Sequence, residues 1–353
     1  MKRNILLFVL ALGVLMTSCG KIENQQATTE REGEVVVNFS LGYATKATGG
    51  IDDDAINSAY VFAFDGNRLD GSAQVSSSTG TISVTPGSRR FIAVVNPNSE
   101  FTFTNVTTPA SLMDIVSQLS SEGLADMVMV GENTAAISAN SSNVAITVTR
   151  LVSKISVNSL KFQLTGALAG KTVSNVSVYI KNYPTTMTYG GVAGTSYTSG
   201  LFLANQSSFE VYDAIGTVTS GSAAEGAHHF FCYERPTQSS TGGKGAIRLC
   251  IKGDINGQTY YWSIPVNNGS TWKTTAFQTG DSHYGVKRNH SYSYDITVTR
   301  AGVPDDGQDP DPTDPDDNGN DNLEDDDDVT TKSIVFTLTV ADFIPVAEQT
   351  VTF

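Results

Sequence analysis

Cys19 has the clearest chemistry in the sequence, because it ends a short apolar segment at the N-terminus. Lys2 and Arg3 precede an apolar run from Ile5 to Met16. That run is too short for a permanent membrane-spanning helix and is typical of a signal peptide. Its end, Met16-Thr17-Ser18-Cys19, resembles a bacterial lipobox. Cys19 is therefore expected to become the lipidated first residue of an outer-membrane lipoprotein precursor; an unlipidated signal peptide is the alternative.

Lys46 is a candidate site for proteolysis. It is the single basic residue of a loop rich in Gly and Thr that spans residues 44–50. Such loops are preferred sites of proteolytic nicking, so a trypsin-like maturation protease is expected to cut before Ala47. Because a predicted strand at 34–43 precedes the loop, this cut would release both the lipid and that strand.

The histidines and carboxylates do not form a recognisable reaction centre. His228 and His229 are adjacent, so on a strand they would point to opposite faces, and His228 with Cys232 gives only two metal ligands. No nucleophile elbow and no phosphate-binding glycine loop is present in the sequence. We therefore expect no catalytic residue, no metal site and no cofactor, and a protein that is not an enzyme.

Three weaker patterns each have two interpretations. Cys232 and Cys250 form either a disulfide across a hairpin made by residues 230–233 and 247–251, or two small core residues. An acidic stretch has the spacing of half a calcium loop, or is a solvated linker whose charges repel one another; its residues are Asp314, Asp316, Asn318, Gly319 and Asp325. Four aromatic residues form either a sugar-binding platform or core packing, namely Tyr183, Tyr189, Trp262 and Trp272.

The acidic charge is concentrated in one linker at 303–330, which is rich in Asp and Pro. The linker holds thirteen acidic residues and no Lys or Arg, so it accounts for all but one unit of the formal net charge of −14. The rest of the chain is near neutral and shows no basic stripe, which argues against nucleic acid as a partner.

Alternating apolar residues dominate the elements that surround these sites, and they predict an all-β chain. One short helix is expected to begin at Thr108-Pro109 and to continue through Leu112, Ile115, Val116 and Leu119 to Gly123. A hairpin about Pro86-Gly87 is expected to pair residues 81–84 with 90–95.

The two ends of the chain offer strands of similar character. Val35, Val37, Phe39 and Leu41 alternate with smaller or polar residues near the N-terminus. Near the C-terminus the alternating residues are Ile334, Phe336, Leu338 and Val340. Each strand could fill the same hydrophobic groove by completing the same sheet. A flexible linker of about 25 residues spans roughly 28 Å, enough to reach a neighbouring copy.

Several motifs in this order resemble the type V fimbrillins, the major fimbrial subunit lipoproteins of Gram-negative anaerobes. Besides the lipobox and the loop at Lys46, they are the stretches at residues 86–96, 150–155, 287–292 and 340–343. The resemblance implies two transthyretin-like β-sandwich domains, lipidated export, removal of the first strand by an arginine-specific protease, and polymerisation by donor-strand exchange. Lys46 departs from the family pattern, in which this residue is Arg.

Together these features predict six segments. They are a signal peptide at 1–18, a lipidated spacer at 19–33, an N-terminal sandwich domain at 34–149, a C-terminal sandwich domain at 150–302, the acidic linker at 303–330, and a tethered donor strand at 331–353. In a monomeric precursor the first strand is expected to sit in the N-terminal sheet, with the C-terminal strand loose or packed weakly on its own second domain.

The hypothesis is a structural pilin subunit of a cell-surface fimbria that mediates adhesion or biofilm formation. Its expected partners are other copies of itself, other fimbrial subunits including an anchor subunit, and host or bacterial surface receptors. The alternatives are a tip or accessory adhesin of the same fimbria, and a surface glycan-binding lipoprotein.

Overall fold

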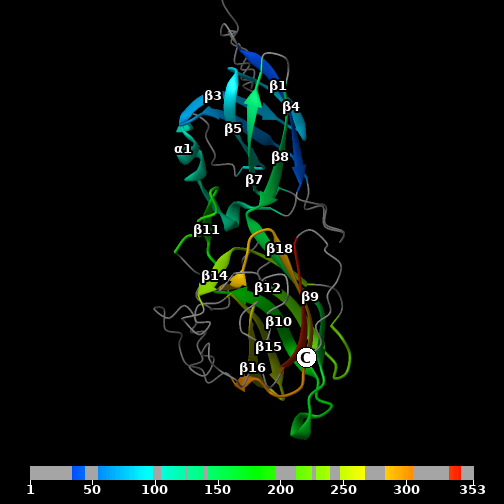
Figure 1. Ribbon diagram of the computed structural model, residues 1–353. Helices are drawn as coiled ribbons and strands as arrows, with labels where there is room; N and C mark the ends of the chain where they lie inside the picture. The colour runs from blue at the N-terminus through cyan, green and yellow to red at the C-terminus, as the bar shows by residue number, and fades with distance from the viewer. Residues whose placement is uncertain are drawn as a thin grey trace, which may run out of the picture.

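The chain folds mainly into β-strands, which form two groups stacked one above the other (Figure 1). The computed structural model describes residues 34–43, 55–97, 105–123, 126–138, 142–195, 212–224, 228–238, 247–266, 283–304 and 334–342. The prediction of an all-β chain is confirmed. Cys19, Lys46 and the acidic linker from residue 305 onward lie outside the described residues.

The upper group is a seven-stranded sheet whose two outermost strands approach each other. Its order is β3-β2-β5-β7-β8-β1-β4. A side chain at Gly71 in β3 would collide with the backbone carbonyl of Ser83 in β4, so glycine allows these two strands to come close. The strands are β1 (Val35–Tyr43), β2 (Ala59–Asp65), β3 (Arg68–Val75), β4 (Thr79–Val84), β5 (Gly87–Val95), β7 (Met129–Ile137) and β8 (Ser142–Arg150).

Alternate residues of these strands enclose one hydrophobic core, as the period of two in a strand requires. Val61, Phe91 and Ile146 are fully buried there. The predicted hairpin of 81–84 with 90–95 is wrong, because β4 pairs with β1 whereas β5 pairs with β2 and β7. Pro86-Gly87 turns the chain from one part of the sheet to another without joining paired strands.

The lower group contains two larger sheets. One has the order β12-β10-β15-β16-β19 and the other the order β13-β9-β18-β20. Two further short strands, β14 (Arg235–Gln238) and β17 (His283–Val286), pair with each other. The strands of the larger sheets are β9 (Val152–Phe162), β10 (Val173–Lys181), β12 (Tyr212–Val218), β13 (His228–Tyr233), β15 (Arg248–Ile255), β16 (Gln258–Pro265), β18 (His290–Val298), β19 (Val303–Pro304) and β20 (Ile334–Asp342).

The two groups are joined by a continuous hydrophobic cluster and by a small β-ribbon. The chain passes from β8 in the upper sheet to β9 in a lower sheet at Leu151, which is itself buried. Strand β6 (Val116–Gln118) from the upper part pairs with β11 (Thr186–Thr188) from the lower part. Backbone hydrogen bonds extend this ladder, with Leu119 donating to Thr185 and Tyr189 donating to Ile115.

The predicted helix is shorter than its apolar spacing indicated. Thr108 caps it with a capping box to Ser111, but α1 (Pro109–Met113) ends after five residues. The following residues form β6 and a short 3-10 turn, η2 (Leu119–Ser121). Pairing with β11 overrides the helical pattern there, and Val116 is 53% exposed.

Candidate functional site

Strand β1 lies between β8 and β4 near one edge of the upper sheet. It runs antiparallel to β4, from the pair Val35–Val84 to the pair Ser40–Thr79. It runs parallel to β8, from Val37–Ser142 to Tyr43–Val148. A single strand therefore supplies the backbone connection between β4 and the first part of β8.

Neither neighbour of β1 has an extensive second ladder among the described residues. The only strand that pairs with β4 there is β1. The ladder between β8 and β7 covers Val148 to Arg150, which leaves residues 142–147 paired with β1. Taking β1 away would leave two separated strand edges facing each other across a cleft, and open edges of this kind favour pairing with another chain.

The inner face of β1 is part of the hydrophobic core. Val37, Phe39 and Leu41 are 0%, 3% and 5% exposed, whereas Val36 on the outer face is 57% exposed. Burial of a side chain of this size stabilises a fold by about 1.5–3 kcal/mol. Losing all three would therefore remove a large share of the stability of an ordinary domain, which is about 5–15 kcal/mol.

The outer face of β1 is polar and slightly hollowed. Asn38 donates a hydrogen bond to Asn143 of β8 at 3.3 Å. A hollow of about 440 Å³ lies here, bordered by Asn38, Ser40, Thr79, Thr81 and Asn143 together with Phe39, Gly80 and Val144.

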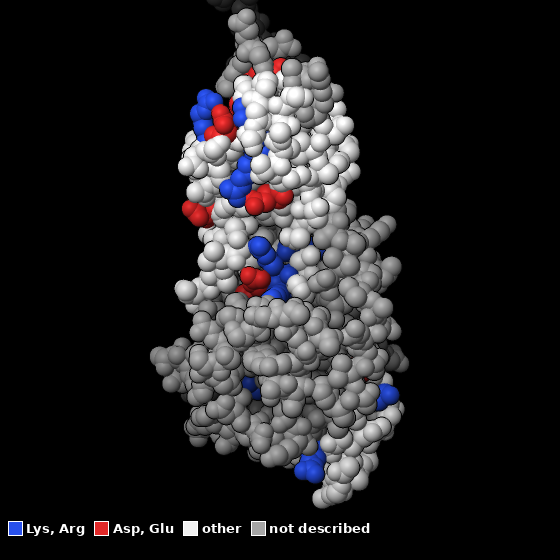
Figure 2. Space-filling model, viewed as in Figure 1, with Lys and Arg blue, Asp and Glu red and all other residues white. Residues whose placement is uncertain are grey.

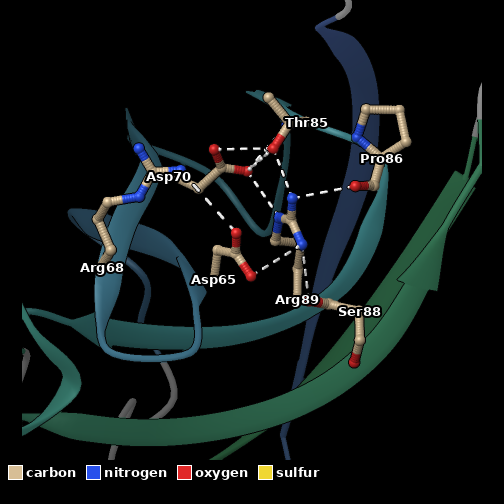
Figure 3. Close-up of polar contacts among 7 residues, drawn as sticks. All are labelled: Asp65, Arg68, Asp70, Thr85, Pro86, Ser88 and Arg89. Atoms are coloured by element: carbon tan, nitrogen blue, oxygen red, sulfur yellow. Dashed lines mark hydrogen bonds and ion pairs between the residues drawn. The ribbon is translucent and has the colours of Figure 1, made fainter.

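A buried ion pair holds β4 against β3 and β5 (Figure 3). Arg89 of β5 donates from Nε to Oδ2 of Asp70 in β3 at 2.7 Å, and the two side chains are 6% and 2% exposed. The backbone N–H of Thr85, the residue after β4, donates to the same carboxylate at 2.8 Å. Arg89 also donates to the carbonyl of Pro86 at 3.0 Å and lies 3.4 Å from Asp65.

These contacts govern the ionisation of Asp70. Burial alone would raise the pKa of its carboxyl, but hydrogen bonds from Arg89 and Thr85 and the charge of Arg89 outweigh burial and lower the pKa. Asp70 is thus held ionised beside its partner. The network anchors β4 through contacts that do not involve β1.

The C-terminal strand β20 occupies the edge of a lower sheet. It pairs antiparallel with β18 from Val298–Ile334 to His290–Asp342. Ile334, Phe336, Leu338 and Val340 stand opposite residues of β18 that are all buried, namely Val298, Ile296, Tyr294 and Tyr292.

A second buried carboxyl lies where the two strand groups meet. Glu122 accepts hydrogen bonds from the hydroxyl of Tyr233 in β13 at 2.5 Å and from the hydroxyl of Ser117 in β6 at 3.0 Å. The N–H of Val128 donates to its other oxygen at 3.1 Å. Burial raises the pKa of Glu122 to about 7, although these three hydrogen bonds oppose the shift.

The structure separates the cysteines and buries most of the aromatic residues that the sequence had left open. Cys232 and Cys250 are both free and buried in different sheets, so they are small core residues, and the alternative of a disulfide across a hairpin is wrong. Tyr183, Tyr189 and Trp262 are at most 2% exposed, so they are core residues and not a sugar-binding platform. Trp272 and the calcium-like stretch lie outside the described residues.

The histidines also do not converge on a site. His229 shares a hydrogen bond with Ser156 at 2.9 Å, and burial, followed by the charges of Lys154 and His228, lowers its pKa to about 4. Within the described ranges, no group of three or more His, Cys, Asp or Glu side chains is placed to hold a metal ion.

On the described part of the face in Figure 2, some charged side chains stand in small groups that contain both signs, and others, including basic ones in the lower part, stand alone. No helix among the described residues combines the length and the apolar character needed to cross a membrane.

Sequence reasoning missed three parts of this arrangement. They are the Asp70–Arg89 pair, the contact of Glu122 with Tyr233, and, among the described residues, the place of β1 as the strand that bridges β4 and most of β8. All three depend on contacts between distant segments. Asp70 alternates with the polar residues Arg68, Ser72 and Gln74 of β3, so its sequence carried no signal for the first.

The fold is shared with solved structures of several bacterial proteins, although no family model and no curated protein matches the sequence. A "putative cell adhesion protein" of Parabacteroides distasonis has 17% identity and a TM-score of 0.59 over 90% of this chain and 99% of its own. One of Bacteroides eggerthii has 16% identity and a TM-score of 0.61 over 88% and 96%. A fimbrilin of Porphyromonas gingivalis has 15% identity and a TM-score of 0.54 over 76% and 91%. The chain therefore has the fold of fimbrilin-like proteins, as its resemblance to type V fimbrillins implied.

Proposed function

We propose that the protein is a structural subunit of a cell-surface fimbria that polymerises by donor-strand exchange. In this proposal the precursor is exported as a lipoprotein on Cys19 and is cut after Lys46. Strand β1 then leaves, and residues 331–353 of another copy fill the space. The position of β1 as the bridge between β4 and most of β8 carries the proposal, because its departure would create an apolar cleft with two open strand edges.

The two strand groups are proposed to be two transthyretin-like sandwich domains, 34–149 and 150–302. The change of sheet at Leu151 supports this division. A donor strand on a 29-residue linker between β19 and β20 favours a stalk subunit over a tip adhesin. The shared fold with a fimbrilin and with adhesion proteins is consistent with a partner set of like subunits.

Removing the donor segment tests the proposal directly. After limited proteolysis, the full chain should form ladders or filaments, and a chain that ends at residue 330 should remain monomeric. Equal assembly by both chains would refute donor-strand exchange.

Substitution at the cleavage site tests the trigger separately. Lys46→Ala should block release of the first strand, whereas Arg31→Ala, which removes a basic residue upstream of that strand, should not. N-terminal sequencing of surface-extracted protein should begin at Ala47. A mature protein that still contains 35–43 would contradict the processing step.

A further inference from the structure

Phe39 sits over a glycine of the neighbouring strand, and this pair defines one position in the β1 site. Phe39 stands opposite Gly80 of β4 in the antiparallel register. A Cβ atom at Gly80 would lie 2.5 Å from Cζ of Phe39 and 2.6 Å from Cγ1 of Val75. The absence of a side chain at Gly80 therefore makes the room that the Phe39 ring occupies.

Gly80 is required there by space and not by backbone conformation, since its φ does not fall in the left-handed region. An aromatic side chain that covers a glycine on the adjacent strand is a recognised way to fix the register of a sheet. Phe39 is only 3% exposed. A strand that replaces β1 must bring a ring to the same place or leave a cavity, which costs stability in proportion to its volume.

Strand β20 carries one aromatic residue, Phe336, at the matching place. Residues 334–338 read Ile-Val-Phe-Thr-Leu and residues 37–41 read Val-Asn-Phe-Ser-Leu. In the same chain direction, the three inward positions match as aliphatic, Phe and Leu, and the outward position after Phe is a hydroxyl residue in both. Read in the opposite direction about Phe336, Leu338 would take the place of Val37 and Ile334 that of Leu41, but the apolar Val335 would take the outward place of Ser40.

We propose that Phe336 of a second copy takes the place of Phe39 over Gly80, so that the donor strand runs parallel to β8 and antiparallel to β4. Ile334 then replaces Val37 and Leu338 replaces Leu41. This inference rests on the proposed function and adds to it the direction, the register and the residue that specifies both.

A slipped register is disfavoured by packing. A slip of two residues toward the C-terminus of the donor would put Phe336 opposite Ile82, which is 2% exposed, and Leu338 over Gly80, so it overfills one core position and underfills another. A strand reversed about Phe336 keeps the ring over Gly80 and differs on the outer face, where Val335 would replace the hydroxyl residue at the Ser40 position. Overpacking and cavities each cost about 1–3 kcal/mol or more.

Cysteine pairs on the polar outer face can read the register. Thr81 is exposed and stands opposite Asn38, so in the proposed register it faces Val335. Opposed residues in an antiparallel pair have Cα atoms about 4.5–5.5 Å apart, within the range of a disulfide. Mixing processed Thr81→Cys subunits with Val335→Cys subunits should give a covalent dimer after mild oxidation. Thr337→Cys or Thr339→Cys donors should cross-link to Thr81→Cys at least tenfold less.

The result separates the register from the proposed function. Preferred cross-linking by Thr337→Cys would mean that the donor strand is slipped or reversed, and preferred cross-linking by Thr339→Cys would mean that it is reversed. Either result overturns the inference about register but leaves donor-strand exchange intact. Filaments without any of these cross-links would also overturn it. Loss of filaments in every sample, including the wild type, would refute the proposed function. Each single variant oxidised alone controls for Cys232 and Cys250, which are buried.

A second measurement tests the specifying residue. Gly80→Ala in the acceptor should slow assembly with a wild-type donor about tenfold, and Phe336→Leu in the donor should restore part of the rate. Unfolding of the uncut Gly80→Ala monomer shows whether the acceptor remains folded. Assembly that is equally fast with both acceptors, or no recovery by Phe336→Leu, would contradict the role of this pair.

Discussion

At the residue scale, two buried carboxyls have opposite electrostatic situations. Asp70 lies beside the guanidinium of Arg89, and its pKa is lowered although burial opposes this. Glu122 is surrounded by neutral donors, so burial dominates and its pKa rises to about 7. The first stabilises the fold when ionised and the second when protonated, and each difference leads to a measurable pH dependence.

Replacing Asp70 with Asn should cost about 3 kcal/mol of unfolding free energy at pH 7, because Arg89 would lose its buried counter-charge. The folded pKa of Asp70 lies below its unfolded value. The stabilisation of the fold by ionised Asp70 is therefore present above about pH 4 and is lost as the pH falls through the folded pKa. Urea unfolding at a series of pH values should show the difference from wild type shrinking at acid pH.

Glu132 supplies the matched control for Asp70. It forms an ion pair with Arg90 on the surface, where the two side chains are 51% and 40% exposed. Glu132→Gln should therefore change stability by less than about 1 kcal/mol at any pH. Equal effects of both substitutions would show that the buried pair has no special role.

Glu122→Gln should make the protein more stable at alkaline pH than the wild type. Because burial raises the folded pKa of Glu122 to about 7 from its ordinary value of 4.5, the wild type should lose stability as the pH rises from 4.5 to 7 and level off above that. The neutral amide removes this loss. Thermal melts from pH 4 to 8 measure this loss of stability, and Asp114→Asn, at an exposed carboxyl, is the control. Parallel pH profiles of the wild type and Glu122→Gln would contradict the prediction.

At the element scale, β1 and β20 are both strands with alternating apolar residues in their sequences, but their places in the sheets differ. Strand β1 has a neighbour on each side, whereas β20 lies at an edge with β18 as its neighbour. A central strand that is removed leaves two edges, and an edge strand that is removed leaves one. This difference suits β1 to be the strand whose space is filled and β20 to be the strand that moves.

Hydrogen exchange on a chain that begins at Ala47 should locate the edges left by β1. Amides in β4 and in residues 142–147 should exchange about two orders of magnitude faster than in the intact chain, because β1 is their ladder partner. Amides that pair β2 with β5 serve as the internal control and should stay protected. Uniform loss of protection, or no change in β4, would show that β1 does not hold these strands.

At the scale of the whole molecule, the two strand groups are coupled. One buried cluster includes Phe62 and Ile92 above and Phe162 and Trp262 below. The ribbon of β6 with β11 crosses the junction, as does the hydrogen bond between Tyr233 and Glu122. Because these contacts do not involve β1, the remaining strands of the upper group can stay packed on the lower group when β1 is lost.

This coupling predicts a single cooperative unfolding transition for the intact chain. Calorimetry should give one peak whose calorimetric enthalpy equals its van't Hoff enthalpy. Ser117→Pro would break the ribbon by removing a ladder donor and should split the peak, whereas Val116→Ala, on the exposed side of the same strand, should not. Two peaks for the intact chain would show that the groups unfold independently.

The sequence by itself determined that residues 35–43 form a strand, which of its residues face inward, and where the first helix begins. The alternation at Val37, Phe39 and Leu41 correctly marked the buried face of β1, and Thr108-Pro109 correctly marked where α1 begins. These features are local, since a period of two and a cap involve residues only a few positions apart.

Only the tertiary structure decided which strands pair and which polar groups meet. Local sequence patterns did not reveal that β4 pairs with β1 in place of β5, or that residues 116–118 form a strand and not a helix. They also did not reveal the contact between Glu122 and Tyr233, which lie 111 residues apart. The physical reason is that ladders are made by backbone groups that every residue carries. The choice of partner strand therefore depends on how whole faces pack, as at Phe39 and Gly80, where the fit becomes visible only when the two strands lie side by side.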